Sequence, residues 1–265
     1  MSGGMPLSSL SNPRVKYMVR LCKSASYRAR TGRFVLDGVK LCSDALRFGI
    51  AIDSVYYTEK ALAANGGIIE ALIASAENSF SVTPDVLKKI ADTVTPQGVV
   101  CECIVPESRF ALSDIVSGGR YVVLEDISDP ANLGAIARSC EALGVDAVLI
   151  IGDSSCDMYS PKAQRAAMGA LMRLPVAHAS ADELFAALAA VGLPTYAAAL
   201  TDGALPLDEA DFSSGAAVFI GNEGHGLSAE TIEWCNQNLI IPIKGGSESL
   251  NAAAAAAIIA YILTR

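Results

Sequence analysis

The chain has 265 residues, of which 52% are hydrophobic and 18% are charged. This length and apolar content allow it to bury a large core, which excludes an intrinsically disordered protein. The 22 glycines and 11 prolines follow no period, which excludes a collagen-like or other fibrous protein. The longest apolar run, residues 250–263, contains Asn251 and is too short to span a bilayer. No apolar run with a basic flank precedes Arg14, so we expect a cytoplasmic protein without a secretory signal or a membrane partner.

The seven cysteines do not predict a metal site. Their number is odd and no Cys-x-x-Cys pair occurs, whereas structural metal sites need four ligands at characteristic spacings. The nearest pattern is Cys101-Glu102-Cys103, and its alternation predicts two core thiols on one face of a strand. We therefore expect no bound metal.

The net charge of −8 is unevenly distributed along the chain. Residues 1–50 hold nine basic residues against Asp37 and Asp44, whereas the other 215 residues hold 11 basic and 26 acidic residues. This asymmetry favours a basic N-terminal domain that meets phosphates, followed by an acidic half with another task. A solvated basic helix face would explain the same charges, and charge alone does not choose between the two.

The first hundred residues alternate between predicted helices and strands. Ser11-Asn12-Pro13 offers a cap and a first turn for a helix over residues 13–23, with Arg14, Arg20 and Lys23 near one side. Apolar periodicity then predicts strands at 34–36, 53–57, 80–82 and 99–104 and helices at 39–48, 68–76 and 84–91. We expect a small α/β domain over residues 1–106, followed by a breaker-rich linker at 107–119.

Residues 120–265 repeat the alternation with more strongly apolar strands. The predicted strands are 121–124, 147–151, 174–177, 195–200, 217–220 and 239–242, and the predicted helices are 133–143, 161–172, 181–191, 229–235 and 249–263. Strands that are continuous apolar runs are buried on both faces, so we expect an α/β domain with a mostly parallel sheet and helices on both sides. Ligands of such sheets bind beyond the carboxyl ends of the strands.

The first candidate loop follows the strand at 121–124 and leads into a helix that carries Asn132 and Arg138. Arg138 stands on an otherwise apolar helix and needs an anion or a partner, because burying an unpaired charge is costly. A salt bridge to Asp126 or Asp129 would meet this need structurally.

The second candidate loop, residues 221–228, places three glycines after a strand, where they allow a ligand to approach the backbone closely. No G-x-G-x-x-G occurs in the chain, which removes the main support for a dinucleotide-binding crossover. His225 could act as a general base, although an exposed loop histidine is the simpler interpretation.

The third candidate loop, residues 241–251, leads into a helix that begins with six alanines. Ser247 or Ser249 could cap this helix, with its free amides directed at whatever occupies the loop. Helix propensity alone explains the alanines, but they would also permit close packing against another backbone or another subunit.

These three segments, in this order and at these spacings, resemble the signature motifs of the SpoU/TrmH family of RNA ribose 2′-O-methyltransferases in the SPOUT superfamily. The motif D-P-x-N-x-G-A-I-x-R is matched from Asp129 to Arg138, and G-x-E-x-x-G-L from Gly221 to Leu227. The motif I-P-M-x-G-x-x-x-S-L-N-V-S is matched by Ile241, Pro242, Gly245, Ser249, Leu250 and Asn251. The basic segment 12–38 is similar to the small RNA-binding domain that precedes the catalytic domain in many members.

The resemblance implies a deep trefoil knot in the C-terminal domain, S-adenosylmethionine as methyl donor, and a homodimer. The donor would be held by the loops around Gly221, Ile241 and Leu250. The implied catalytic residues are Asn132 and Asn251, which orient the reacting groups, Glu223, which organises the loops, Ser249, and Arg138. A guanidinium stays protonated, so we expect Arg138 to stabilise charge on the hydroxyl or the adjoining phosphate rather than to abstract a proton.

The implied reaction is methyl transfer to a ribose 2′-hydroxyl of RNA, and ribosomal RNA is the expected substrate, bound through the basic N-terminal domain. The alternatives are a transfer RNA 2′-O-methyltransferase and a non-catalytic protein that binds RNA or S-adenosylmethionine. A non-catalytic protein is disfavoured by five intact motif residues: Asn132, Arg138, Glu223, Ser249 and Asn251. The chain departs from the family pattern at Ala167, Ala252 and Ala253, where hydroxyl or β-branched residues are common, and at Ile243, where methionine is usual.

Overall fold

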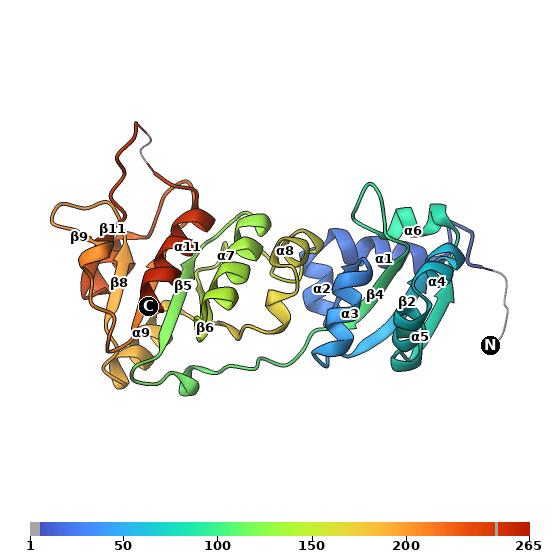
Figure 1. The fold of residues 1–265 in the computed structure, drawn as a ribbon, viewed down its shortest axis with the longest axis horizontal. Helices are drawn as coiled ribbons and strands as arrows, with labels where there is room; N and C mark the ends of the chain where they lie inside the picture. Colours follow the sequence, from blue (N-terminus) through green and yellow to red (C-terminus); the bar gives the residue numbers. More distant parts are fainter. Residues whose placement is uncertain (1–5, 247–248) are drawn as a thin grey trace. The chain divides into compact units, whose positions relative to one another are not determined.

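The computed structural model describes residues 6–246 and 249–265, and the chain folds into two compact units (Figure 1). Unit 1 comprises Met1–Glu107 and Asp157–Met172, and unit 2 comprises Ser108–Cys156 and Arg173–Arg265. Each unit has its own sheet and its own buried apolar residues. No helix in the described part of the chain is long and apolar enough to cross a membrane.

Unit 1 is built on a four-stranded mixed sheet in the order β1–β4–β2–β3. The strands are β1 (Arg33–Asp37), β2 (Ile52–Tyr57), β3 (Asn78–Ser81) and β4 (Val99–Ile104). The helices are α1 (Pro13–Lys23), α2 (Ala25–Thr31), α3 (Val39–Arg47), α4 (Glu59–Ala64), α5 (Gly66–Ser75), α6 (Pro84–Ile90) and α8 (Pro161–Ala167). Strand β4 is antiparallel to β1 and β2, whereas β3 is parallel to β2.

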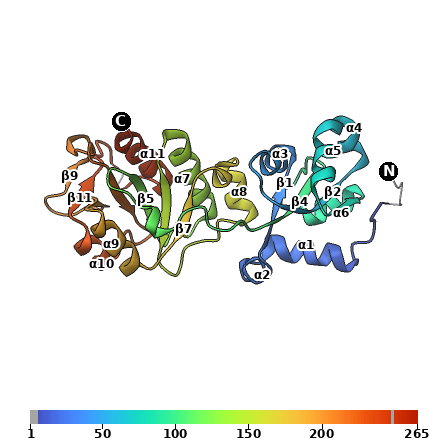
Figure 2. The same cartoon turned by 90° about the horizontal axis from the view of Figure 1, so that it is seen from below.

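Different helices cover the two faces of this sheet, because successive side chains of a strand point to opposite faces. Val35, Tyr56 and Val100 pack with the apolar sides of α1 and α6, and the opposite face packs with α3 and α5. Figure 2 shows α1 on one side of the sheet and α3 and α5 on the other. Cys101 and Cys103 lie fully buried on the α3 and α5 side, which confirms the prediction of two core thiols on one face of a strand.

Two short helices of unit 1, α2 and α4, are absent from the sequence prediction. Helix α1 begins as predicted, since the Asn12 side chain accepts a hydrogen bond from the Arg14 amide at 2.8 Å. Helix α2 then begins after Ser24, whose hydroxyl accepts from the Tyr27 amide at 3.2 Å, and it ends at Gly32 in the left-handed region. The sequences of α2 and α4 each contain one large apolar or aromatic side chain, Tyr27 and Leu62, so they show no apolar period.

Residues 157–172 pack on unit 1, although the sequence analysis assigned them to the domain over residues 120–265. The buried Arg28 donates to the Asp157 carboxylate at 2.6 Å and to two carbonyls of α1 at 2.7 and 2.8 Å. The rings of Phe34 and Tyr159 lie 5.0 Å apart between centroids. Contacts between residues so distant in the chain leave no local pattern, so the grouping of residues 157–172 with unit 1 could not be predicted from the sequence.

Unit 2 is built on a seven-stranded sheet in the order β7–β6–β5–β10–β8–β11–β9, and all of its strand pairs are parallel. The strands are β5 (Arg120–Glu125), β6 (Ala147–Ile151), β7 (Val176–His178), β8 (Thr195–Ala198), β9 (Leu205–Pro206), β10 (Ala216–Ile220) and β11 (Gln237–Ile240). The helices are α7 (Pro130–Leu143), α9 (Ala181–Ala190), α10 (Ala229–Trp234) and α11 (Ala252–Leu263). The parallel sheet expected from continuous apolar runs is confirmed, and only the two-residue β9 escaped prediction.

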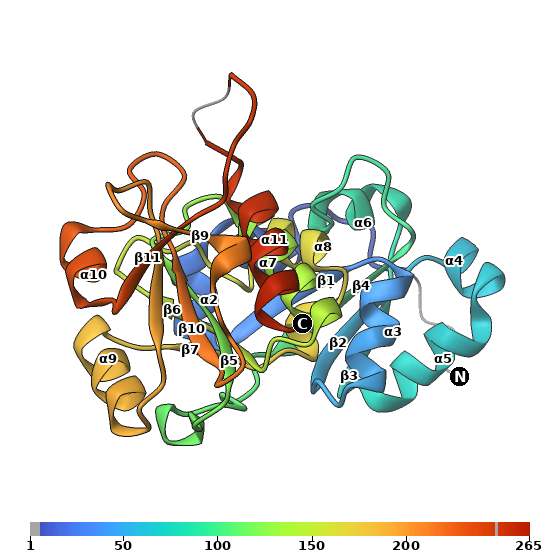
Figure 3. The same ribbon diagram turned by 60° about the vertical axis from the view of Figure 1, so that its left-hand side comes forward.

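Helices cover both faces of this parallel sheet (Figure 3). Helices α9 and α10 pack on the face that holds Tyr121, Val123 and Phe219, and α7 and α11 lie side by side on the other. Small residues such as Ala137 of α7 and Ala256 of α11 are buried there and let the two helices approach closely. This packing brings the first turns of α7 and α11 together at the carboxyl ends of the strands.

We expect Asp157→Ala to destabilise unit 1 by about 3 kcal/mol, because it leaves the buried Arg28 guanidinium without its counter-charge. Asp92→Ala is the matched control, since it breaks a more exposed pair with Arg165 and should cost less than about 1 kcal/mol. Hydrogen exchange of the β1 and β4 amides in the full chain measures both losses. Equal losses in the two variants would contradict a structural role for the buried pair.

Candidate functional site

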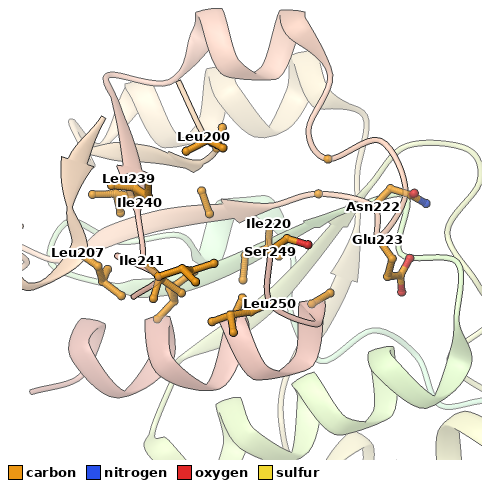
Figure 4. Close-up of a pocket in the computed structure, with 18 of the residues that line it drawn as sticks. Leu200, Leu207, Ile220, Asn222, Glu223, Leu239, Ile240, Ile241, Ser249 and Leu250 are labelled. Carbon is orange, nitrogen blue, oxygen red and sulfur yellow. The ribbon is translucent and has the colours of Figure 1, made fainter. Parts of the chain in front are cut away.

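A pocket of about 470 Å³ opens in unit 2 at the carboxyl ends of β8, β10 and β11, against the start of α11 (Figure 4). Its described lining residues are Ala198, Ala199, Leu200, Leu207, Ile220, Gly221, Asn222, Glu223, Gly224, Gly226, Leu239, Ile240, Ile241, Ile243, Ser249, Leu250, Ala252, Ala255 and Ile259. The pocket lies at the edge where a parallel sheet is expected to bind a ligand. The pocket is lined by Gly221, Ile241 and Leu250, the three residues at which the family resemblance implies donor binding.

The lining of this pocket is mainly apolar. Leu200, Ile243 and Leu250 keep 78%, 39% and 38% of their surface exposed there, and exposed apolar side chains around a concave surface are typical of a ligand site. Glu223 is the one charged side chain among the described lining residues, and Asn222 and Ser249 add neutral polar groups. Such a lining suits a largely apolar ligand, or one with a positive charge.

Residues 221–226 form a tight loop in the wall of the pocket. Asn222 and Gly226 exchange two backbone hydrogen bonds of 3.1 and 2.9 Å, and a Cβ at Gly221 would collide with the Gly226 backbone. The Asn222 side chain accepts from the Gly224 amide and donates to the Asp126 carbonyl, both at 2.7 Å. The loop is therefore fixed both internally and to the chain that follows β5.

Glu223 joins this loop to the beginning of α7. One oxygen of its carboxylate accepts from the Ser128 amide at 3.3 Å and from the Ser128 hydroxyl at 3.1 Å. The other accepts from Nδ2 of Asn132 at 2.7 Å. Asn132 is in position because α7 begins at Pro130, capped by the side chain of Asp129.

Asn251 extends the same network to α11. Its Oδ1 caps that helix by accepting from the amides of Ala253 and Ala254 at 2.9 and 3.4 Å, and its Nδ2 donates to Oδ1 of Asn132 at 3.1 Å. Residues from all three sequence motifs thus meet in one hydrogen-bonded chain, Glu223–Asn132–Asn251. Each of these two asparagines keeps a second side-chain N–H that this chain does not use.

The Glu223 carboxyl has a pKa below its ordinary value. Partial burial pushes this pKa up, but the hydrogen bonds from Asn132 and Ser128 stabilise the carboxylate and outweigh burial. The hydrogen bonds are therefore fully stabilising above the ordinary pKa of 4.5 and are lost as the pH falls through the lowered value. A carboxylate so engaged at neutral pH favours the predicted organising role over that of a base.

Arg138 lies outside this network. It is exposed on α7 and forms no ion pair with Asp126, with Asp129 or with any other residue in the ranges 6–246 and 249–265. The salt bridge considered from the sequence is therefore absent. Asn132 and Arg138 are six residues apart, about 240° around a helix, so their side chains leave α7 on different sides.

Ser249 lines the pocket but does not cap α11, so the predicted serine cap is wrong. Asn251 takes that position because its side chain reaches two free amides at once. Ser247, the other candidate cap, lies outside the described residues. His225 is exposed, as its simpler interpretation predicts, and contacts the loop through its backbone amide.

Two residues of the network, Ser128 and Asn222, received no role from the sequence. Both stand directly beside motif residues in loops that follow strands, and this position was the available signal. Ala167, at a position where the family often has serine, is buried in α8 of unit 1.

Comparisons with known proteins find a matching family model for each part of the chain. The model of the SpoU rRNA Methylase family matches residues 119–261, and that of the MRM3-like substrate binding domain matches residues 12–101. The chain is 30% identical to the 23S rRNA (guanosine(2553)-2′-O)-methyltransferase RlmP of Bacillus subtilis, over 97% of this chain and 98% of that protein. It is 27% identical to the 23S rRNA (uridine(2479)-2′-O)-methyltransferase of Streptomyces viridochromogenes, over 96% and 90% of the two chains.

Two solved structures are similar to this chain over nearly its whole length. The AdoMet-bound rRNA methyltransferase of Sinorhizobium meliloti superposes with a TM-score of 0.87 at 29% identity, over 97% of this chain and 96% of that one. The SpoU methyltransferase AviRb of Streptomyces viridochromogenes, in complex with AdoMet, gives a TM-score of 0.84 at 25% identity, over 96% and 97%.

We expect Glu223→Ala to loosen the loops around the pocket without unfolding unit 2. The substitution removes the acceptor of the Ser128 amide, so hydrogen exchange at Ser128 should accelerate by about tenfold. The amides of β10 should keep their protection, because the exposed Glu223 side chain adds little to the core. Glu233→Ala on α10 removes an exposed carboxylate of the same size and is the control; unchanged exchange at Ser128 in Glu223→Ala would refute the role.

Proposed function

Because the chain belongs to the SpoU rRNA methylase family, we propose that it transfers a methyl group from S-adenosylmethionine to a ribose 2′-hydroxyl of ribosomal RNA. The observation that carries the proposal is the meeting of the three motifs in one pocket and one hydrogen-bonded chain. Relatives that span nearly the whole chain bear the names of 23S rRNA 2′-O-methyltransferases. Family membership also implies the deep trefoil knot.

The pocket fits S-adenosylmethionine in shape and charge. Gly221 permits the tight loop that forms one wall of the pocket, and apolar side chains such as Ile241 and Leu250 offer contacts for a flat adenine ring. No basic side chain stands among the described lining residues, and Glu223 is anionic, so nothing there opposes a sulfonium cation. We assign Gly221, Ile241 and Leu250 to donor binding.

S-adenosylmethionine supplies an electrophilic methyl group. A ribose 2′-hydroxyl is a weak nucleophile, so this chain must align it and stabilise the charge that develops as its proton leaves. The free N–H groups of Asn132 and Asn251 are held by Glu223 in positions to orient the ribose, with Ser249 beside them. The protonated guanidinium of Arg138 stabilises negative charge on the attacking oxygen or the adjoining phosphate.

We further propose a homodimer formed through α11. Ala254, Ile258 and Tyr261 lie at helical spacing on one exposed side of this helix, with Ile258 and Tyr261 40% and 54% exposed. An apolar stripe of this kind favours a partner surface. In such a dimer the exposed Arg138, on the neighbouring α7, is available to the pocket of the partner, which would reconcile its place outside the network with a catalytic role.

Unit 1 is assigned to binding of the RNA substrate. It holds 14 basic against 11 acidic residues, whereas unit 2 holds 6 against 17. The match of residues 12–101 to a substrate binding domain supports this division of roles. An enzyme of ribosomal RNA works where ribosomes are assembled, so we expect it in the cytoplasm.

Transfer of a labelled methyl group from S-adenosylmethionine to purified RNA tests the function. We expect label in 23S rRNA prepared from cells that lack this protein, at a nucleotide whose 3′ phosphodiester then resists alkaline cleavage because the 2′-oxygen is blocked. Label in transfer RNA alone would favour the alternative substrate. Donor binding without transfer to either RNA would favour a non-catalytic protein.

Arg138→Ala should lower single-turnover methyl transfer on the order of 10²-fold, as expected when a preorganised transition-state donor is lost. Donor affinity by calorimetry and the melting temperature should change little, because Arg138 is exposed and outside the pocket lining. Arg138→Lys, which keeps the charge without the planar fork, should recover part of the rate. A fully active Arg138→Ala protein would remove this residue from the mechanism.

Ala254→Trp should convert the dimer to a monomer while unit 2 stays folded. Ala254 is exposed within one chain, so a bulky side chain there clashes with a second copy and not with the core. Light scattering at micromolar concentration measures the mass, and Glu230→Trp on α10 is the control for added surface area. A monomeric wild-type protein would contradict the proposed dimer.

A further inference from the structure

Helices α1 and α2 together form the most strongly basic segment of unit 1. Residues 13–31 contain six basic residues and no acidic one. Two of the six have structural tasks. Arg28 is buried against Asp157, and Arg14 donates to the hydroxyls of Ser54 and Tyr56, both at 3.2 Å.

The other four basic residues, Lys16, Arg20, Lys23 and Arg30, are exposed. None of them forms an ion pair with a residue that the structure describes. Lys16, Arg20 and Lys23 follow one another at spacings of four and three, which places them along one side of α1. These four cations therefore face solvent together without a neutralising carboxylate.

Two of these cations lie against the ring of Tyr27. The guanidinium carbons of Arg20 and Arg30 lie 4.5 and 4.9 Å from the centroid of this one ring. The ring face attracts each guanidinium, but the two positive charges repel each other. The ring thus holds two guanidiniums that form no ion pair with a described residue, and such an arrangement suits a negatively charged ligand.

Two other cations of the first fifty residues are less available, because each forms an ion pair. Arg33 pairs with Asp53 at 2.8 Å and with Glu102 at 3.3 Å, and Lys40 pairs with Asp44 at 2.6 Å. The positive charge of residues 1–50 is thus partly neutralised inside the fold. Among the cations of residues 1–50 that are exposed and form no ion pair with a described residue, four lie on α1 and α2 and one, Arg47, lies on α3.

We propose that Lys16, Arg20 and Lys23 along one side of α1, together with Arg30 against the ring of Tyr27, form the surface of unit 1 that binds the phosphates of the RNA substrate. This inference rests on the proposed function and deepens it by assigning the contact to α1 and α2. Arg and Tyr side chains also offer flat surfaces on which an unpaired base can stack, so a single-stranded or looped segment fits best. A membrane surface fits poorly, since the exposed positions of α1 and α2 carry no large apolar side chain to insert.

The test compares two charge-matched double variants of the full chain for binding to a 23S rRNA transcript. Arg20→Gln/Arg30→Gln alters the proposed surface. Arg47→Gln/Lys60→Gln removes the same charge from α3 and α4, and α3 packs on the opposite face of the sheet from α1. The first should bind on the order of tenfold more weakly, with the slope of log affinity against log salt reduced by about 1.4, or 0.7 for each lost phosphate contact. The second should bind like the wild type.

Kinetic constants and substitutions of Tyr27 provide two further tests. A purely structural role of these residues would not produce the changes expected below. Arg20→Gln/Arg30→Gln should raise KM for RNA at unchanged kcat, because phosphate contacts far from the reacting atoms bind ground and transition states equally. Tyr27→Leu should weaken RNA binding, and Tyr27→Phe should retain it. Equal affinity of both double variants, or equal loss in both, would overturn the assignment of this surface.

The experiments distinguish a wrong assignment of the RNA-binding surface from a wrong assignment of the enzymatic function. RNA binding lost in Arg20→Gln/Arg30→Gln alone, with no methyl transfer by the wild type, would support the surface and reject the enzyme. Methyl transfer by the wild type with full RNA affinity in that variant would support the enzyme and reject the surface. A wild-type protein that does not bind the transcript would reject the surface as well.

Discussion

The Glu223 carboxylate accepts hydrogen bonds from the Ser128 amide and hydroxyl and from the Asn132 side chain, residues 95 and 91 positions away in the chain. Through Asn132 it also fixes Asn251, the cap of α11. One charged group thus connects the loop after β5, the loop after β10 and the start of the last helix. The shape of the pocket depends on this connection, because the three segments share no strand pairing beyond the ends of the sheet.

The parallel sheet makes this meeting possible. Strands β5 and β10 are neighbours, and the pairing of Leu124 with Ile220 ends both at the same edge. The loops that follow them must therefore leave side by side. Helices α7 and α11 then pack against each other through small residues, which brings Asn132 within reach of Asn251. Secondary structure places the backbone, and the carboxylate selects the side-chain arrangement.

The sequence predicted most of the architecture, since both the strands and the longer helices have strong apolar patterns. The parallel sheet of unit 2 follows from continuous apolar runs, and the α/β class of unit 1 from its alternating segments, whereas the antiparallel pairing of β4 was not predicted. The predicted domains and the two compact units differ where a long-range contact decides the grouping. Residues 157–172 join unit 1 because Arg28 needs Asp157, and no local pattern contains that information.

The site residues were predicted less evenly than the fold. The resemblance to the family implied donor binding at Gly221, Ile241 and Leu250, and these three residues line one pocket. The roles within the network depend on which atom reaches which partner, so spacing alone chose a serine cap where Asn251 serves. Arg138 shows the same limit, because it forms no salt bridge with Asp126 or Asp129, which the sequence offered as its partners.

The distribution of charge imposes a division of labour between the units. RNA is repelled by the acidic unit 2, yet a sulfonium donor is favoured there, so one surface cannot attract both. At physiological ionic strength this repulsion is screened within about 8 Å, which means that it acts only once RNA is close to unit 2. Cations such as Arg20 and Arg30 compensate for it by holding the phosphates on unit 1. Affinity for RNA then resides in residues that take no part in methyl transfer, and the pocket is free to keep the anionic Glu223 network that its geometry requires.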